Sequence, residues 1–210
     1  ARVEVIEVAQ YGKATLFNNP DGCTSLLNDR PPLLLRATVH AANGSTYPVT
    51  VVVNHLRSLN GIDDTGAGSN GWPTEGDRVR NKRAQQARFL ADLVQSRQVA
   101  DANERIVLVG DFNAFEFNDG YADIMGIVRG DEVPEDQVVT WLASPVTTPL
   151  VDGSDLIADA TERYSYVFEG SAQTLDHVIV NEALLMDAQL ASAKVEHARI
   201  NADFGVHNFG

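Results

Sequence analysis

One short run of β-branched residues constrains the fold more than any other part of the chain. Residues 49–53 read Val-Thr-Val-Val-Val, which is apolar on both faces of an extended strand. Such strands are typical of the interior of a sheet that neighbouring layers cover on both sides. The run therefore predicts a central strand in a layered fold, and it is far too short to cross a bilayer.

The flanking sequence predicts further strands and helices around that strand. Two β-rich segments, 32–39 and 47–54, surround Asn43-Gly44, a pair that tolerates the positive φ of a hairpin turn. In residues 77–98 apolar side chains recur at spacings of three and four, which indicates an amphipathic helix. Other strands are predicted at 106–109, 164–168 and 176–181, and a short helix at 121–128. Strands interleaved with helices favour an α/β fold.

Composition limits the classes of function. The formal net charge is −13, so bulk electrostatics would repel nucleic acid, and a passive nucleic-acid-binding module is disfavoured. An enzyme that holds a cation and contacts its substrate briefly is compatible with this charge. The single cysteine, Cys23, excludes an internal disulfide framework and a thiolate zinc cluster. Two alternatives stay open for it: a small buried apolar residue, or half of a bridge to a missing segment.

Polar residues lie at the ends of three predicted strands. They are Asn54-His55 after the first, Asp111-Phe112-Asn113 after the second, and Asp176-His177 at the start of the third. Asp111 and Asn113 are two apart, so their side chains point the same way on an extended strand. Phosphodiester hydrolysis needs a carboxylate to aim or deprotonate water, and donors or a cation for charge on the phosphoryl oxygens. These residue types match that need.

Each motif alone also has a structural explanation. A single histidine is more often structural, an Asp-Phe-Asn sequence can close a strand as an Asx turn, and an aspartate at a strand start is commonly a turn residue. Because three such motifs occur in order, each at a strand end, a catalytic interpretation is favoured over the structural one.

The three motifs, taken with their neighbours, resemble the successive signatures of the endonuclease/exonuclease/phosphatase superfamily, which has the deoxyribonuclease I-like fold. They are Asn54-His55-Leu56-Arg57-Ser58, Gly110-Asp111-Phe112-Asn113-Ala114 and Leu175-Asp176-His177. Four more stretches are similar to the bacterial extracellular nuclease subgroup: 30–33, 80–87, 164–170 and 200–203. The resemblance covers about residues 28–204.

The resemblance implies a fold and a set of roles. The fold would be a four-layer α/β/β/α sandwich of two packed mixed β-sheets with outer helices, of which residues 1–210 form a partial single domain. Asp111 would orient or deprotonate the attacking water, and Asn113 would help to hold it and the phosphate. His55 would contact the scissile phosphate and assist the leaving group. Asp176 would hydrogen-bond a second histidine.

Further expectations concern binding and location. By the same resemblance Asn54, Arg57 and His177 would contact substrate phosphate, and Asp111 and Asn113 would bind Mg²⁺ or Mn²⁺, with Ca²⁺ as a structural ion. The expected activity is a nuclease acting on DNA or RNA, with no membrane partner, secreted or periplasmic. The alternatives are a phosphodiesterase or phosphatase for lipid or inositol phosphates, and a non-catalytic binding domain.

The sequence departs from the superfamily pattern at both ends. The metal-binding glutamate and an early asparagine are expected in a segment preceding this chain. A final Ser-Asp-His motif is due after residues 200–203, and His207 lacks the Ser-Asp that would identify it. We therefore expect these residues alone to be inactive or nearly so.

Two surface features have open interpretations. The loop 59–76 would bind a second cation through Asp63 and Asp64, or be a solvated acidic loop. A basic cluster would face phosphates or be a solvated helix start; its members are Arg78, Arg80, Lys82 and Arg83.

Overall fold

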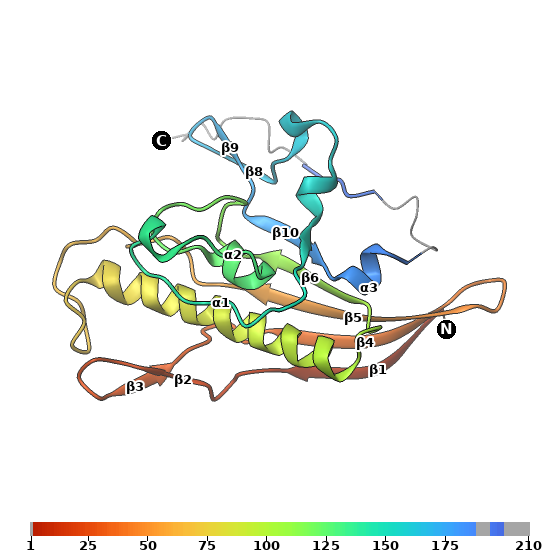
Figure 1. The fold of residues 1–210 in the computed structure, drawn as a ribbon, viewed down its shortest axis with the longest axis horizontal. Helices are drawn as coiled ribbons and strands as arrows, with labels where there is room; N and C mark the ends of the chain where they lie inside the picture. The colour runs from red at the N-terminus through yellow and green to blue at the C-terminus, as the bar shows by residue number, and fades with distance from the viewer. Residues whose placement is uncertain (1, 188–193, 200–210) are drawn as a thin grey trace, which may run out of the picture.

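The computed structural model describes residues 2–187 and 194–199, and its main feature is a twisted sheet with a long helix lying along it (Figure 1). The predicted motif at 200–203 and His207 lie outside the described residues. The strands are β1 Val3–Gln10, β2 Leu16–Asn18, β3 Thr24–Leu26, β4 Leu33–His40, β5 Thr46–His55, β6 Ile106–Asp111, β7 Val151–Asp152, β8 Tyr166–Phe168, β9 Ser171–Gln173 and β10 Asp176–Val180. The helices are α1 Glu75–Ala100, α2 Ile124–Arg129 and α3 Glu182–Leu185, with short 3₁₀ turns at Glu135–Gln137, Gly153–Leu156 and Ala160–Glu162.

Six of the strands form one mixed sheet in the order β1-β4-β5-β6-β10-β7. β4 and β5 are antiparallel and join through the Asn43-Gly44 segment, as predicted. β5 and β6 are parallel, which is possible because α1 provides the long crossover between them. β10 then runs antiparallel to β6. Each predicted strand and helix of these segments is present, so the sequence patterns were interpreted correctly here.

Helix α1 begins at a capping box. The Thr74 hydroxyl accepts a hydrogen bond from the Asp77 backbone N–H, and the Asp77 carboxylate accepts one from the Thr74 N–H. This reciprocal pair satisfies two backbone N–H groups that the first turn would leave without partners. The helix therefore starts two residues before the predicted position and ends two residues after it.

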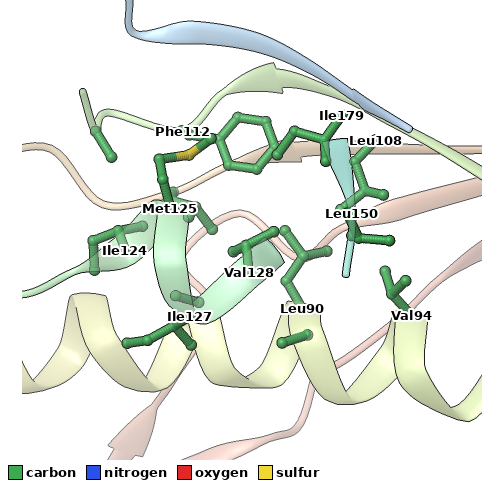
Figure 2. Packing of buried hydrophobic residues seen from close by; sticks show 14 of the residues in the cluster. Leu90, Val94, Leu108, Phe112, Ile124, Met125, Ile127, Val128, Leu150 and Ile179 are labelled. Atoms are coloured by element: carbon green, nitrogen blue, oxygen red, sulfur yellow. The ribbon is translucent and has the colours of Figure 1, made fainter. Parts of the chain in front are cut away.

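The core lies between the sheet and the two helices. Alternate strand residues, among them Val52, Leu108 and Ile179, are fully buried and point toward α1. Figure 2 shows α2 wedged between the two layers, with Met125 against Phe112 and Val128 near Leu90 of α1. Burying such side chains contributes about 1.5–3 kcal/mol each, so this layer pair has a substantial core of its own.

The other face of the sheet is apolar and exposed. Strand register and side-chain alternation place five strongly exposed apolar residues on it: Val3, Val5, Val8, Leu33 and Val53. The prediction that 49–53 is covered on both faces is therefore wrong for the described residues, since Val53 is 43% exposed. The predicted mixed α/β class with outer helices is confirmed. The described residues form one sheet layer and one helix layer of the predicted four-layer sandwich.

Two smaller findings complete the fold. Cys23 is exposed and unbridged among the described residues, so the prediction of a small buried apolar residue is wrong. The alternative of a bridge to a missing segment stays a prediction. The segment of Cys23 is a tight turn between β2 and β3, which leaves no apolar pocket for a thiol. No helix in the described part of the chain is long and apolar enough to span a bilayer.

Gly110 makes the approach of β6 to β5 possible. Its φ is +132°, and a Cβ at this position would lie 2.0 Å from the Asn54 carbonyl oxygen. We expect Gly110→Ala to lower the free energy of unfolding by about 3 kcal/mol or more, because both strain and a backbone clash result. Gly22→Ala is the matched control: its φ is +83°, with open space around the added Cβ, and its expected cost is about 1 kcal/mol. Equal losses for both variants in urea unfolding would contradict this explanation.

Candidate functional site

Three of the predicted catalytic residues lie in one row across three adjacent strands. His55 of β5 is the register partner of Asp111 of β6, and Asp111 is the partner of Asp176 of β10. The sequence separates these residues by more than 50 positions, and the sheet brings them together at one end. By alternation the row continues the open apolar face, since Val53 precedes His55 by two residues.

The side chains of the row are accessible and close to one another. His55 Nε2 lies 3.3 Å from Asp111 Oδ2, with the side chains 44% and 34% exposed. This separation is within ion-pair distance, and both side chains reach solvent. The pair can thus exchange protons with a water or a substrate oxygen next to it.

Asn113 holds the loop that follows Asp111. Its φ is +48°, an uncommon left-handed conformation that asparagine tolerates better than most residues. Its backbone N–H donates to Asp111 Oδ1 over 2.7 Å, and its side-chain amide donates to the Leu56 carbonyl over 3.0 Å. Asn113 therefore fixes one carboxylate oxygen of Asp111 and joins the loops after β5 and β6.

Helix α1 fastens the same two loops from behind. The buried Arg83 guanidinium donates to the carbonyls of Arg57 and Asn113, the latter over 2.8 Å. Gln86 accepts from the Arg57 N–H over 2.8 Å and donates to the Leu27 carbonyl. Burial lowers the pKa of Arg83 to about 10, so it stays charged at neutral pH.

This arrangement corrects both interpretations of the basic cluster on α1. Arg80 and Lys82 are buried to 8% and 5% exposure, and they pair with Asp77 and Asp29. Arg78 pairs with Glu75. The cluster is neither a phosphate-facing strip nor a solvated helix start, because its charges are neutralised by nearby carboxylates or used to bind backbone carbonyls.

Removing the Arg83 guanidinium should loosen these loops. We expect Arg83→Met to lower the free energy of unfolding by about 2–4 kcal/mol, because two buried carbonyls lose their donors. Arg36→Met is the control, since the Arg36 side chain is 47% exposed and its carboxylate partner is 3.5 Å away. Denaturant unfolding of the two variants checks this, and equal losses would show that Arg83 contributes no more than a surface ion pair.

His177 has a different place from the one predicted. Its side chain is fully buried on the helix-facing side of β10, where Nδ1 lies 2.6 Å from Asp152 Oδ2 and Nε2 lies 2.9 Å from the Ala114 carbonyl. The prediction that His177 contacts phosphate is wrong, because both ring nitrogens are already bonded inside the protein. It instead ties β10 and β7 to the loop that follows Asp111.

The two partners of His177 determine its charge. A carboxylate and a carbonyl accept but do not donate, so both ring nitrogens must carry hydrogen to satisfy them. Burial opposes the charged form, but the hydrogen bond and charge of Asp152 raise the pKa of His177. Burial likewise opposes ionisation of Asp152, yet the His177 hydrogen bond and charge lower the Asp152 pKa. A buried imidazolium–carboxylate pair results.

The other two predicted phosphate contacts lie behind the row. Asn54 is 3% exposed, on the helix side of β5, and its amide atoms have no partner among the described residues. Its predicted contact with phosphate is wrong, because strand alternation turns it away from His55. Arg57 is partly exposed in the loop after β5, and its backbone is hydrogen-bonded to α1, which holds this loop in place. The predicted contact of Arg57 with phosphate stays a prediction.

The described residues supply only part of a metal site. Asp111 and Asp176 provide carboxylates on neighbouring strands. Within 2–187 and 194–199, however, no group of three or more His, Cys, Asp or Glu side chains is placed to hold an ion. This also holds for the second cation site considered at Asp63 and Asp64. Within these ranges the donors do not complete a Mg²⁺ site.

Sequence reasoning missed Asp152, Arg83 and Gln86 as parts of this region. Asp152 had a weak signal, since it directly follows the apolar pair Leu150-Val151 and an acid buried beside such a pair needs a partner. Arg83 and Gln86 had none, because charged and amide residues on a helix are usually solvated.

Comparisons with known proteins give likeness of fold only. No family model matches the chain, and no curated protein matches it. Among solved structures, the human Nocturnin catalytic domain is 13% identical with a TM-score of 0.45, over 86% of this chain and 49% of that one. Truncated TDP2 of Caenorhabditis elegans is 12% identical with a TM-score of 0.45, over 86% and 54%.

A third solved structure carries the superfamily name. An endonuclease/exonuclease/phosphatase family protein of Bacteroides thetaiotaomicron is 10% identical with a TM-score of 0.44, over 86% of this chain and 50% of that one. The chain thus spans about half the length of the structures it resembles. These likenesses do not bear on the bacterial extracellular subgroup, which stays a prediction.

Proposed function

We propose that this chain carries part of the catalytic centre of a phosphodiesterase, with nucleic acid as its substrate. The observation that carries the proposal is the row His55–Asp111–Asp176 at one end of the sheet. These residues come from three separate motifs, and a purely structural origin gives no reason for three accessible ionisable groups to meet there.

The geometry supports a specific division of labour. Asp111 has one oxygen fixed by the Asn113 N–H and the other directed at His55, so its carboxylate is held in one orientation. In that state it can accept a proton from an attacking water. His55 can donate a proton to the departing oxygen or a hydrogen bond to the phosphate. Asp176, next in the row, would hydrogen-bond a second histidine and fix its orientation, as the motif resemblance implies.

Dependence on Mg²⁺ or Mn²⁺ is part of the proposal. Carboxylate and amide oxygens of the Asp111 and Asn113 type are hard ligands that these ions prefer. Such an ion would supply positive charge for the phosphoryl oxygens. Removal of the ion by EDTA tests this dependence.

The choice of nucleic acid over other phosphodiesters rests on the motif resemblance, as does a secreted or periplasmic location. Phosphodiesters of lipid or inositol are the second candidate, because the same chemistry serves both and a fold does not determine the substrate. The test below separates them.

The test uses the full natural protein that contains this chain. Plasmid DNA, RNA and sphingomyelin are incubated side by side with Mg²⁺, with Mn²⁺ and with EDTA. We expect cleavage of DNA or RNA that EDTA abolishes. Cleavage of sphingomyelin alone would overturn the substrate assignment and keep the chemistry. No hydrolysis of any substrate would overturn the enzyme proposal in favour of a binding domain.

A further inference from the structure

The β8–β9 hairpin presents an exposed aromatic surface. Tyr166 and Phe168 of β8 are 40% and 50% exposed, and their rings stack with centroids 6.2 Å apart at an interplanar angle of 22°. They are two residues apart on one strand, so they share one face of the hairpin. Neither ring belongs to the buried core, so core packing does not account for these aromatic residues.

This hairpin is attached directly to the candidate site. The Ser165 hydroxyl, next to Tyr166, accepts hydrogen bonds from the backbone N–H groups of Leu175 and Asp176, over 3.2 and 3.3 Å. Asp176 is the third member of the catalytic row. The aromatic surface therefore begins one residue from a contact with that row.

A second aromatic pair lies on the neighbouring segment. Phe115 and Phe117 follow Asn113 closely, and their rings stack with centroids 5.2 Å apart at 8°, with Phe117 60% exposed. The two segments are hydrogen-bonded to each other, since the Phe112 N–H donates to the Leu175 carbonyl over 2.9 Å. The segments that carry the two aromatic pairs thus both adjoin the row.

The charges of the chain make such rings more important for binding. The net charge is −13, and the basic side chains of α1 nearest the site are paired or buried. Attraction to phosphate, which supplies most of the affinity of basic nucleic-acid-binding proteins, is therefore weak here. Contacts that do not need positive charge would therefore add to the affinity for a nucleic acid.

We propose that Tyr166 and Phe168 are a stacking surface for the unpaired bases of single-stranded nucleic acid entering this site. The inference rests on the proposed function and specifies the form of its substrate. Bases in a single strand present their faces to aromatic side chains, whereas bases in a duplex are already stacked on each other. Phe117, on the segment that follows Asp111, would offer a further ring to the same single strand.

The test measures equilibrium binding by fluorescence anisotropy, in EDTA so that nothing is cleaved. The full protein is titrated with a labelled single-stranded oligothymidylate and with an abasic oligomer of the same length. We expect Tyr166→Leu and Phe168→Leu each to weaken oligothymidylate binding by about 5- to 100-fold, the range for loss of one stacked base. Binding of the abasic oligomer should be weak throughout. Leucine keeps the apolar surface and removes the stacking face.

Val99→Ala is the control, because Val99 is 75% exposed at the far end of α1. It should bind as the unaltered protein does, and circular dichroism verifies that all variants fold. Equal binding of the abasic and oligothymidylate strands, unchanged affinity of both leucine variants, or tighter binding of duplex would each overturn the inference. Hydrolysis of bis(p-nitrophenyl) phosphate by the unaltered protein reports on the proposed chemistry separately, so the two ideas can fail independently.

Discussion

Replacing Asp111 by asparagine should reduce phosphodiester hydrolysis by the full protein by about 10²- to 10⁴-fold, the range for loss of a general base. Asparagine has nearly the same shape but cannot accept a proton from water. The remaining amide oxygen can still accept the Asn113 N–H, which is 2.7 Å from Oδ1 in the present structure. The turn should therefore survive, and only the chemistry should be lost. Initial rates on DNA and on a small diester measure the effect.

The control for this variant is Asp63→Asn, which removes an exposed carboxylate from the loop 59–76. It should retain full activity if that loop is a solvated acidic surface. Thermal unfolding of both variants should match that of the unaltered protein. A stable Asp111→Asn protein that hydrolyses DNA at the normal rate would show that the row is not the catalytic centre.

Replacing Asp152 by alanine should lower the free energy of unfolding by about 3–5 kcal/mol. The substitution leaves the His177 imidazolium fully buried without its counter-charge, and an unpaired buried charge is among the most destabilising changes known. Asp152→Asn, which still accepts a hydrogen bond at Nδ1, should lose less. Asp155→Ala is the matched control, because Asp155 lies in the same 3₁₀ turn with its side chain 56% exposed. Urea denaturation at pH 6 measures all three.

The same pair predicts a pH dependence of stability. The pKa of His177 is raised above its ordinary 6.5. The contribution of His177 to the free energy of unfolding is therefore complete below about pH 6.5 and is lost as pH rises through the raised pKa. The pKa of Asp152 is lowered below its ordinary 3.8. The contribution of Asp152 to the free energy of unfolding is therefore complete above about pH 3.8 and is lost as pH falls through the lowered pKa. The difference in stability between the unaltered protein and Asp152→Asn should be largest between these limits. A difference that does not vary with pH would contradict the charged pair.

Much of the local structure could be predicted from residue patterns alone. The β-branched run around Val51 gave a central strand, the three- and four-residue spacing gave α1, and Asn43-Gly44 gave a hairpin. These succeed because the period of apolar residues and the φ preferences of turn residues are local properties. The identity of the row residues His55, Asp111 and Asp176 was also readable, because each follows or begins an apolar strand.

The predictions that failed concern which face a side chain occupies. Asn54 and His177 each adjoin a row residue in sequence, and both point to the helix side of the sheet. Arg83 is on a helix start that looks solvated, yet it is buried against two carbonyls. A one-residue step reverses the face on a strand, so neighbours in a motif need not share a site.

The sequence by itself determined the strands, the long helix and the acidic and imidazole groups at the strand ends, since these depend on short-range patterns. Only the tertiary structure decided that β5, β6 and β10 are adjacent in register, and hence that His55, Asp111 and Asp176 form one row. It also decided that Asp152 is the partner of His177. Strand order and the pairing of buried charges depend on contacts between distant segments, and no local pattern encodes which distant segment will supply the partner.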